Sequence, residues 1–314
     1  MNTISVIICT YNGEKYIEEQ LNSLKRQSIF IDEYIICDDN SLDNTCNIIE
    51  NYIKKNPELN INLFRNSKNK GVIKNFEFGL KQASGDYIAF CDQDDVWLPN
   101  KMELSLNKIQ EMEEKYGKNM PLLVHTDLVV VDENLDIINQ SFFKQEGLNV
   151  YKDENILKAL FLQNNLVGCT MFFNKIAKNL SLPFPEHIIM HDYWLGLVVA
   201  CKGKIEFINQ GTIKYRQHKK NVVGAKTYIS INSLKKIFNK NYLDKSINSV
   251  IIQNRELVNY KSGILVKNNN WFIEALKAIE ENNIIRMIKL GIHKHGILRN
   301  IIVYVYFMIR KFDL

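Results

Sequence analysis

The feature that most constrains the fold is a pattern that repeats through the first hundred residues. A short apolar run ends in a polar cluster, and a segment with apolar residues at helical spacing follows; the runs are Ser5–Cys9, Glu33–Cys37, Ile61–Phe64 and Tyr87–Cys91. Such runs are typical of buried strands, and the segments between them indicate amphipathic helices. The alternation predicts an α/β fold with a mostly parallel central sheet and helices on both faces.

Polar side chains follow three of these runs at the points where the predicted strands end. The clusters are Thr10–Asn12, Asp38–Ser41 and Asp92–Asp95. Parallel strands end at one edge of a sheet, and ligands of open α/β sheets bind beyond the carboxyl ends of the strands. The three clusters are therefore expected to meet in one crevice.

The third cluster places three carboxylates, those of Asp92, Asp94 and Asp95, within four residues. Neighbouring negative charges raise one another's pKa, whereas a hard divalent cation with oxygen ligands neutralises them and can also hold a diphosphate. Magnesium is typically bound through one or two carboxylates and the phosphates of a substrate. These residues alone indicate either such a metal site or a solvated acidic turn that caps the following helix.

Composition excludes few classes of protein. A chain of 314 residues with 46% hydrophobic side chains can bury a full core, and the net charge of +5 is too small to indicate a nucleic-acid partner. The six cysteines are far apart and contain no CxxC pair, which favours free thiols in a reducing cytosol. The N-terminus has no basic region before its apolar run, so it predicts a strand and no signal peptide. A cytoplasmic protein, with at most peripheral membrane contact, is expected.

After about residue 100 the alternation loosens. A charged helix is expected at Lys101–Tyr116, then strands at Leu122–His125 and Leu128–Val131 and a turn at Asp132–Asn134. From about Ser230 onward the chain is helical in character, and no Pro/Gly linker separates this part. The second half is expected to carry the contacts to a second substrate.

The polar clusters belong to a longer ordered series of motifs: Ser5–Asn12, Ile35–Ser41, Asn69–Gly71 with Asn75, Ser84–Tyr87 and Asp92–Asp95. In order and spacing this series resembles the nucleotide-binding half of the family 2 glycosyltransferases. The resemblance implies a GT-A fold over residues 1–228, with a nucleotide-binding half at 1–100 and an acceptor-binding half at 101–228. Residues 229–314 are then a helical C-terminal region.

The resemblance also implies an activity: metal-dependent, inverting transfer of a sugar from a nucleotide diphosphate donor to a glycan or lipid-linked acceptor. In this reading Asp39 and the turn after the first strand hold the base and ribose, and Asp92 and Asp94 bind Mg²⁺ or Mn²⁺. Asp39 can accept hydrogen bonds from a base or ribose, although it also suits a helix cap or turn, and Gly71 is either a point of close approach or a turn. The residues expected to contact the nucleotide sugar are Thr10, Tyr11, Asn12, Glu14, Asp39, Ser41, Lys70, Gly71, Asn75, Asp92, Gln93 and Arg216.

The motif Met190–Trp194 resembles an acceptor-side element of the family. An inverting transfer needs one general base to take the proton of the attacking acceptor hydroxyl, and Asp192 is the candidate. His191 stands where the family more often has Glu, so it either tunes Asp192, binds the acceptor or is structural. Trp97 and Trp194 either stack on an acceptor sugar ring or lie in the core.

The motif Tyr215–Gly224 resembles a second acceptor-side element. His218 matches the histidine that completes the metal site in some members of the family, and imidazole suits Mn²⁺; otherwise it is a surface histidine. Arg216, Lys219 and Lys220 either stabilise charge on the departing diphosphate or form a solvated basic face.

In the C-terminal segment Ile285–Phe312, basic residues alternate with apolar ones, and an apolar run ends in Arg310 and Lys311. This composition suits a helix that lies in a membrane interface and is attracted to anionic lipid, where a lipid-linked acceptor would also reside. The alternative is a helix packed on the protein core or on a second subunit, which leaves the oligomeric state open.

Within the family, the motifs at Asp92–Trp97 and Tyr215–Gly224 look most like bacterial rhamnosyltransferases of surface polysaccharide synthesis. That resemblance implies dTDP-L-rhamnose as the donor. The alternatives are a transferase of another sugar, of the UDP-glucose, UDP-galactose or UDP-GlcNAc type, a nucleotidyltransferase, and a non-catalytic nucleotide-sugar binding module. A nucleotidyltransferase usually has a glycine-rich phosphate loop near its first strand, and Thr10–Lys15 lacks that glycine density.

Overall fold

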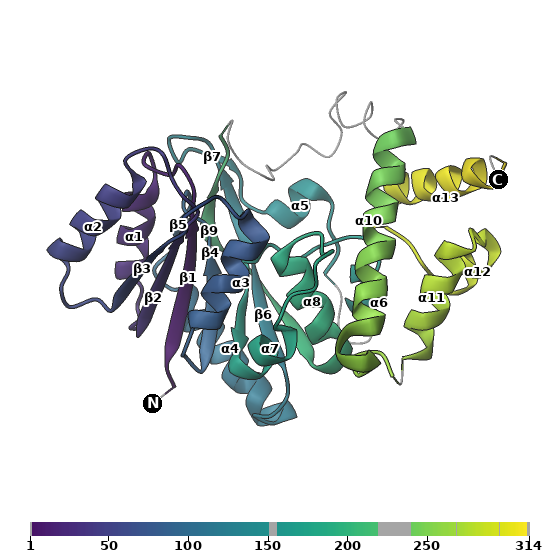
Figure 1. The fold of residues 1–314 in the computed structure, drawn as a ribbon, viewed down its shortest axis with the longest axis horizontal. Coiled ribbons are helices and arrows are strands. Elements are labelled where there is room, and N and C mark those ends of the chain that lie inside the picture. The colour runs from purple at the N-terminus through teal and green to yellow at the C-terminus, as the bar shows by residue number, and fades with distance from the viewer. Residues whose placement is uncertain (1, 151–155, 219–239, 268, 295, 313–314) are drawn as a thin grey trace.

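One central sheet organises the molecule. The computed structural model describes residues 2–150, 156–218, 240–267, 269–294 and 296–312. The strands are β1 (Ile4–Thr10), β2 (Glu33–Asp38), β3 (Ile61–Arg65), β4 (Tyr87–Cys91), β5 (Val96–Trp97), β6 (Leu122–Val131), β7 (Ile137–Asn139), β8 (Phe172–Asn174) and β9 (Lys204–Arg216). They follow the order β3-β2-β1-β4-β8-β6-β9-β5, and β7 pairs with β6 (Figure 1). The predicted α/β fold with a central sheet is confirmed.

The half of the sheet that contains β1 to β4 is parallel. β1 lies between β2 and β4 and pairs in parallel with both, and β2 pairs in parallel with β3. In this register Thr10 lies opposite Asp38, and Cys91 lies opposite Ile8. The polar clusters after β1, β2 and β4 therefore leave the sheet at the same edge, as the sequence predicts.

The other half mixes directions, because β8 runs antiparallel to both β4 and β6 while β6 and β9 are parallel. The expectation of two strands at Leu122–His125 and Leu128–Val131 was wrong: they form the single buried strand β6, whose register shifts at Thr126 and Asp127. These polar residues do not end the strand because their side chains are satisfied: the hydroxyls of Thr126 and Thr212 share a hydrogen bond of 2.7 Å, and Ser141 donates to Asp127.

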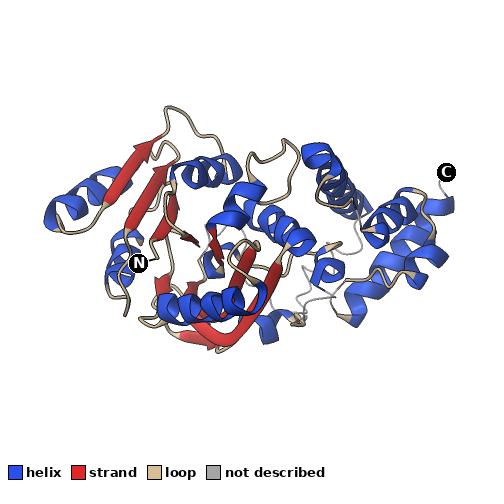
Figure 2. Ribbon diagram, turned by 90° about the horizontal axis from the view of Figure 1, so that it is seen from below, coloured by secondary structure: helices blue, strands red, loops and turns tan. Residues whose placement is uncertain are grey.

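Helices cover both faces of the sheet (Figure 2). Along β1, Val6 and Ile8 point into one core and Ile7 into the other, which is the alternation of a buried strand. The first core is closed by α1 (Ile17–Lys25), α2 (Thr45–Lys55) and α4 (Lys101–Tyr116), and the second by α3 (Val72–Gln82) and α8 (His191–Lys202). The shorter helices are α5 (Phe142–Glu146), α6 (Ile156–Leu160), η2 (Gly168–Thr170) and α7 (Lys175–Ser181).

The C-terminal part is helical, as predicted. It contains α10 (Lys240–Asn259), η3 (Tyr260–Gly263), α11 (Asn270–Glu280), α12 (Ile284–Lys289) and α13 (Ile297–Phe312). These helices extend the core on the α8 side through buried residues such as Leu257, Phe272 and Phe307. Across the described ranges, no helix has the length and apolar character needed to cross a membrane. Because residues 219–239 lie outside the described residues, the domain boundary at 228 stays a prediction.

Candidate functional site at the carboxyl edge of the sheet

The turns after β1 and β2 are tied together by short hydrogen bonds. The hydroxyls of Thr10 and Ser41 both donate to Oδ2 of Asp38, at 2.7 and 2.6 Å, and the backbone N–H of Asn12 donates to Ser41 Oγ at 2.9 Å. Asn12 has φ of +50°, a left-handed conformation that asparagine tolerates better than most residues. The network fixes the turn and leaves the side chain of Tyr11 45% exposed.

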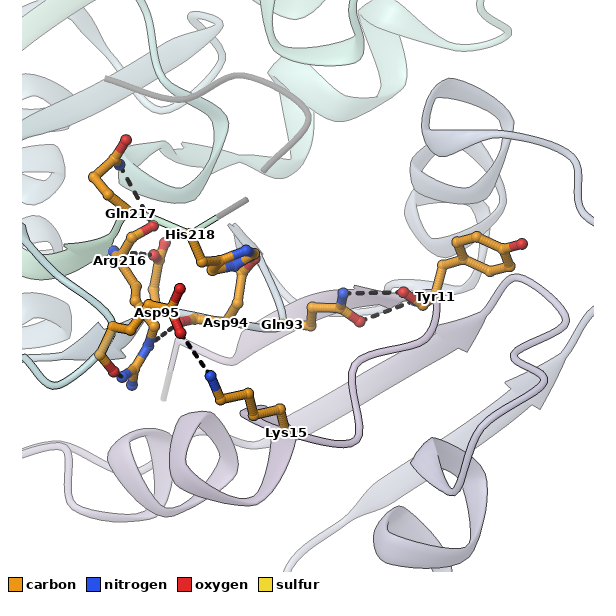
Figure 3. A network of polar contacts seen from close by, with 9 residues as sticks. Tyr11, Lys15, Gln93, Asp94, Asp95, Arg216, Gln217 and His218 are labelled. Atoms are coloured by element: carbon orange, nitrogen blue, oxygen red, sulfur yellow. Dashed lines mark hydrogen bonds and ion pairs between the residues drawn. The ribbon is translucent and has the colours of Figure 1, made fainter. Parts of the chain in front are cut away.

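Residues Asp92–Asp95, which follow β4, form the acidic loop, and Gln93 joins this loop to the turn after β1. The backbone N–H of Tyr11 donates to Gln93 Oε1 at 2.9 Å, and Gln93 Nε2 donates to the Tyr11 carbonyl at 3.1 Å (Figure 3). A Cβ on Gly13 would lie 2.2 Å from Gln93 Oε1, so only glycine permits this approach. Glu14, which also follows the turn, accepts from the backbone N–H of Asn44 at 3.0 Å, just before α2. The three polar clusters therefore meet, as the sequence predicts.

Asp39 holds the loop that follows β3. Its Oδ1 accepts from Asn66 Nδ2 and from the Lys70 backbone N–H, both at 2.9 Å, and its Oδ2 accepts from the Gly71 N–H at 2.8 Å. Gly71 has φ of +83°, which explains the glycine by backbone conformation. Asn75 Oδ1 accepts from Asn66, and Asn75 Nδ2 donates to the carbonyl at the end of β2. The structure thus gathers these predicted residues into one loop, and their contacts to a nucleotide stay predictions.

Within the acidic loop, Asp94 and Asp95 have different surroundings. Asp94 Oδ2 lies 2.8 Å from His218 Nε2 (Figure 3). The imidazole of His218 stacks on Tyr16 with ring centroids 5.1 Å apart. Asp95 is fully buried and its Oδ1 accepts from the Arg216 backbone N–H at 3.1 Å. The predicted pair of Asp94 and His218 is therefore brought together from segments 124 residues apart.

A deeper group of metal-ligand types lies beside this pair. Within the described residues, Asp92, Asp95 and Cys169 each offer an atom within 4.8 Å of the others. Burial, followed by the charge of Asp94, raises the pKa of Asp92 to about 7, and burial raises the pKa of the Cys169 thiol well above its usual value. A thiol that keeps its proton is a poor ligand for a hard cation, whereas crowded carboxylates fit one. The crowded carboxylates and the neighbouring pair of Asp94 and His218 are ligand types that suit Mg²⁺ or Mn²⁺, and the predicted ligand set of Asp92, Asp94 and His218 stays a prediction.

Arg216 clamps the acidic loop. This buried residue donates through Nε to the Asp94 carbonyl at 2.8 Å and through Nη1 to the Glu133 carbonyl at 2.6 Å, and its Nη2 pairs with Glu19. Its guanidinium also lies 4.5 Å from the centre of the Tyr16 ring. In this structure Arg216 binds protein groups, and its contact to a nucleotide sugar stays a prediction. Lys219 and Lys220 lie outside the described residues.

We expect Arg216→Ala to lower the free energy of unfolding by about 3 kcal/mol, because it leaves two carbonyls and Glu19 without their donor. Chemical denaturation of both proteins measures the difference. Lys15→Ala is the matched control: it removes an exposed ion pair to Glu133 and should cost less than about 1 kcal/mol. Equal losses in the two variants would show that Arg216 is no clamp.

Asp192 lies in the first turn of α8 and is buried. Its Oδ2 accepts from the Gly168 N–H at 3.0 Å, and its Oδ1 accepts from Asn164 Nδ2 at 3.1 Å and from the Tyr193 N–H at 2.6 Å. Burial raises the pKa of Asp192 to about 6, and these hydrogen bonds oppose the rise. The charge of Asp192 in turn raises the pKa of Asp92, which places the two carboxylates within electrostatic reach of each other.

The acceptor contacts predicted for three aromatic side chains were wrong. Trp97 and Trp194 are 2% and 0% exposed, and the indole N–H of Trp194 donates to the Ser181 carbonyl, so neither offers a ring face to a sugar. His191 is buried against Phe76, with ring centroids 3.8 Å apart, and this burial lowers its pKa to about 3. A neutral, stacked imidazole is a core residue. All three add apolar area to the core, which is the commoner place for large rings.

Comparison with known proteins decides the family. Residues 5–116 match the family model described as Glycosyl transferase family 2. The dTDP-rhamnosyl transferase RfbG of Shigella flexneri is 30% identical over 230 residues, which are 69% of this chain and 74% of the relative. The chain belongs to glycosyltransferase family 2. A second relative of this glycosyltransferase, the UDP-Glc:alpha-D-GlcNAc-diphosphoundecaprenol beta-1,3-glucosyltransferase WfgD of Escherichia coli, is 29% identical over 217 residues, 68% of this chain and 76% of the relative.

Solved structures agree with the fold of this glycosyltransferase. The crystal structure of S. aureus TarS 1-349 in complex with UDP-GlcNAc superposes with a TM-score of 0.57 at 21% identity, over 90% of this chain and 73% of that chain. The predicted GT-A fold is confirmed.

Several residues that shape the site of this glycosyltransferase are absent from the predicted set. Asp39 was predicted from the Asp38–Asp39 pair, although Asp38 forms the network with Thr10 and Ser41. Asn164 and Cys169 were not predicted, because neither stands in a recognisable motif. The doubled aspartate was a usable signal, whereas only the folded chain brings Asn164 to Asp192.

Proposed function

We propose that this glycosyltransferase is an inverting, metal-dependent enzyme that transfers a sugar from a nucleotide diphosphate donor to a lipid-linked glycan in the synthesis of a bacterial surface polysaccharide. One observation carries the proposal: the carboxylates of Asp94 and Asp192 both act on the charge of Asp92 at the carboxyl end of β4, and Gln93 joins this loop to the turn that exposes Tyr11. The name of the E. coli relative specifies a diphosphoundecaprenol-linked acceptor, which supports this acceptor class.

In the proposed donor site, the nucleotide lies over the turn after β1. The exposed Tyr11 ring offers a stacking face for the base, and hydrogen bonds to Gln93 fix the backbone that carries this ring. Thr10, Asn12, Ser41 and the Asp39 loop line the same edge of the sheet. Asp92 and Asp94, with His218, would hold a divalent cation that neutralises charge on the leaving diphosphate.

In the proposed reaction, Asp192 takes the proton of the acceptor hydroxyl as this oxygen attacks the anomeric carbon. The Gly168 N–H and the Asn164 amide hold the carboxylate in one orientation. With a pKa of about 6, Asp192 is largely ionised at neutral pH and is still a stronger base than an exposed aspartate. General acid–base catalysis of this kind contributes about 10² to 10⁴ in rate.

For the donor, dTDP-L-rhamnose is our first candidate. It rests on the motifs at Asp92–Trp97 and Tyr215–Gly224 and on the name of the S. flexneri relative. UDP-glucose is the second candidate, because the E. coli relative of similar identity is named for it. Pocket contacts that differ by one hydroxyl or methyl group separate such donors, so a binding measurement has to choose between them.

Thermal unfolding with a panel of nucleotide sugars tests the proposal. We expect one nucleotide sugar to stabilise the protein only when Mg²⁺ or Mn²⁺ is present, because the cation joins the diphosphate to the acidic motif. At about 100 times its Kd, such a ligand stabilises a protein by about 2.7 kcal/mol. Nucleoside monophosphates and EDTA serve as controls. If every nucleotide sugar failed to stabilise the protein, or the metal made no difference, the proposal would be contradicted.

A further inference from the structure

Helices α12 and α13 carry one-sided charge in the sequence. Residues 282–312 include six lysines and arginines and no aspartate or glutamate. Within this stretch, Arg286 pairs with Glu274 and Glu281, and Arg299 pairs with Glu146. Lys289 is exposed at the end of α12, and Arg310 and Lys311 occupy the last turn of α13. In the sequence, α12 and α13 therefore both contain basic residues and no acidic ones.

The same helices expose large aliphatic side chains. On α13 the exposed residues Ile301, Val305 and Met308 recur at intervals of four and three, so they share one face, while Tyr306 and Phe307 are buried on another. A helix that is apolar on both faces normally has both faces covered. In the described residues, no protein segment covers the outer face of α13.

The neighbouring helix α12 repeats the arrangement and contacts α13. Ile285 and Ile288 face outward and Met287 is fully buried. We call the five exposed residues of the two helices the aliphatic face; it consists of Ile285, Ile288, Ile301, Val305 and Met308, which are between 44% and 69% exposed. Isolated exposed apolar residues are normal, but a set of five on helices whose charged residues are all basic marks an interaction surface.

Contacts of Arg299 place α13 next to α5. The Arg299 guanidinium donates to the Glu146 carbonyl at 3.1 Å, which ties α13 to α5, the helix that follows β7. Figure 1 shows α13 at the end of the molecule away from β3, towards the upper side, where the carboxyl ends of β1 and β2 also lie. The Arg299 contact therefore ties the helix that carries part of the aliphatic face to the part of the chain that contains the sheet.

We propose that α12 and α13 dock on an anionic lipid bilayer, with the aliphatic face in the headgroup region and the basic residues on lipid phosphates. Aliphatic side chains next to lysine and arginine are the chemistry that binds such a surface. A two-fold symmetric dimer through the same face would set this positive segment against its own copy, and like charges oppose such an interface. The inference goes beyond the proposed function, because it concerns where the enzyme works and not what it transfers.

Co-sedimentation of the full chain with vesicles tests this inference. We expect binding to vesicles of phosphatidylcholine mixed with phosphatidylglycerol, little binding to phosphatidylcholine alone, and release by salt, which screens the charges. The variant Ile301→Glu/Val305→Glu should lower binding by about tenfold, because it places two negative charges in the aliphatic face. The matched control is Phe30→Glu, which changes an exposed apolar residue in the loop before β2 and should bind like the parent.

Two further measurements keep the outcomes distinct. Far-ultraviolet circular dichroism and thermal unfolding establish that the double variant folds, which its exposed positions favour. Sugar transfer to a short, soluble acceptor should be unchanged in that variant, so a loss of vesicle binding cannot be confused with failure of the proposed activity. Equal binding to neutral and anionic vesicles would overturn the inference. So would a parent dimer that the double variant converts to a monomer without any change in vesicle binding.

Discussion

Asp192→Asn is expected to lower the rate of sugar transfer by about 10³-fold while the affinity for the donor stays close to that of the parent. The amide cannot accept the acceptor proton, so the variant loses base catalysis. Donor binding should persist because the residues proposed to contact the donor lie on other elements, the turns after β1, β2 and β4. Steady-state kinetics with the best donor from the thermal screen, together with calorimetric titration of that donor, measure both quantities.

The pH profile provides a second readout of the same experiment. Burial raises the pKa of Asp192 from 3.8 to about 6, so the parent's rate should rise as pH increases through about 6 and Asp192 ionises. The free energy of unfolding should change in the opposite direction to the rate. Because the pKa of Asp192 is higher in the folded protein, this residue favours the folded state at low pH, and its contribution is lost as pH rises from 3.8 to about 6. The variant should lack both changes.

An exposed carboxylate gives the matched control for this substitution. Asp136→Asn makes the same chemical change in the turn between β6 and β7, and the variant should keep the parent's rate and pH profile. If Asp192→Asn transferred sugar as fast as the parent, Asp192 would be removed from the mechanism. A variant that lost donor binding along with turnover would point to a structural role for Asp192.

The first half of the fold could be predicted because its signals are local. Each run from Ser5–Cys9 to Tyr87–Cys91 stops at a polar cluster, and parallel strands bring such ends to one edge. The continuous strand β6 could not be predicted, because Thr126 and Asp127 look like an interruption until Thr212 and Ser141 satisfy them. Those partners come from other elements, so no local pattern reveals them.

In the site, too, local signals could be predicted and contacts between distant segments could not. The clusters after the strands were predictable, whereas the Arg216 clamp was not, because its partner Glu19 is 197 residues away. The burial of Trp194 could not be predicted either. This residue lies two positions after Asp192, but Tyr260 of the C-terminal helices packs edge-on against its ring, with ring centroids 5.0 Å apart. Residue type and spacing indicate which groups can act, and the packing of distant elements decides which of them can reach a ligand.

The structure separates the roles proposed for the acidic residues in a way that a second substitution can test. Asp95 is fully buried and accepts from the Arg216 backbone, so its replacement should disturb folding. Asp94 is partly exposed and its free end faces His218 at 2.8 Å, so it can reach a cation in the crevice. Only the substitution at Asp94 should therefore act through the metal.

Asp94→Asn is expected to lower the transfer rate by about 10³-fold and to abolish the metal dependence of donor binding. Replacing an ionised ligand with a neutral amide weakens the grip on a divalent cation, and loss of metal catalysis is worth about 4 kcal/mol, or about 10³ in rate. Titration of Mn²⁺ in the kinetic assay, and of the donor with and without EDTA, measures the effect. Unfolding of the variant should match the parent's, because the backbone carbonyl of Asp94 still accepts from Arg216. A variant with unchanged metal dependence, or a parent enzyme that works fully in EDTA, would show that the diphosphate is held without a cation at Asp94.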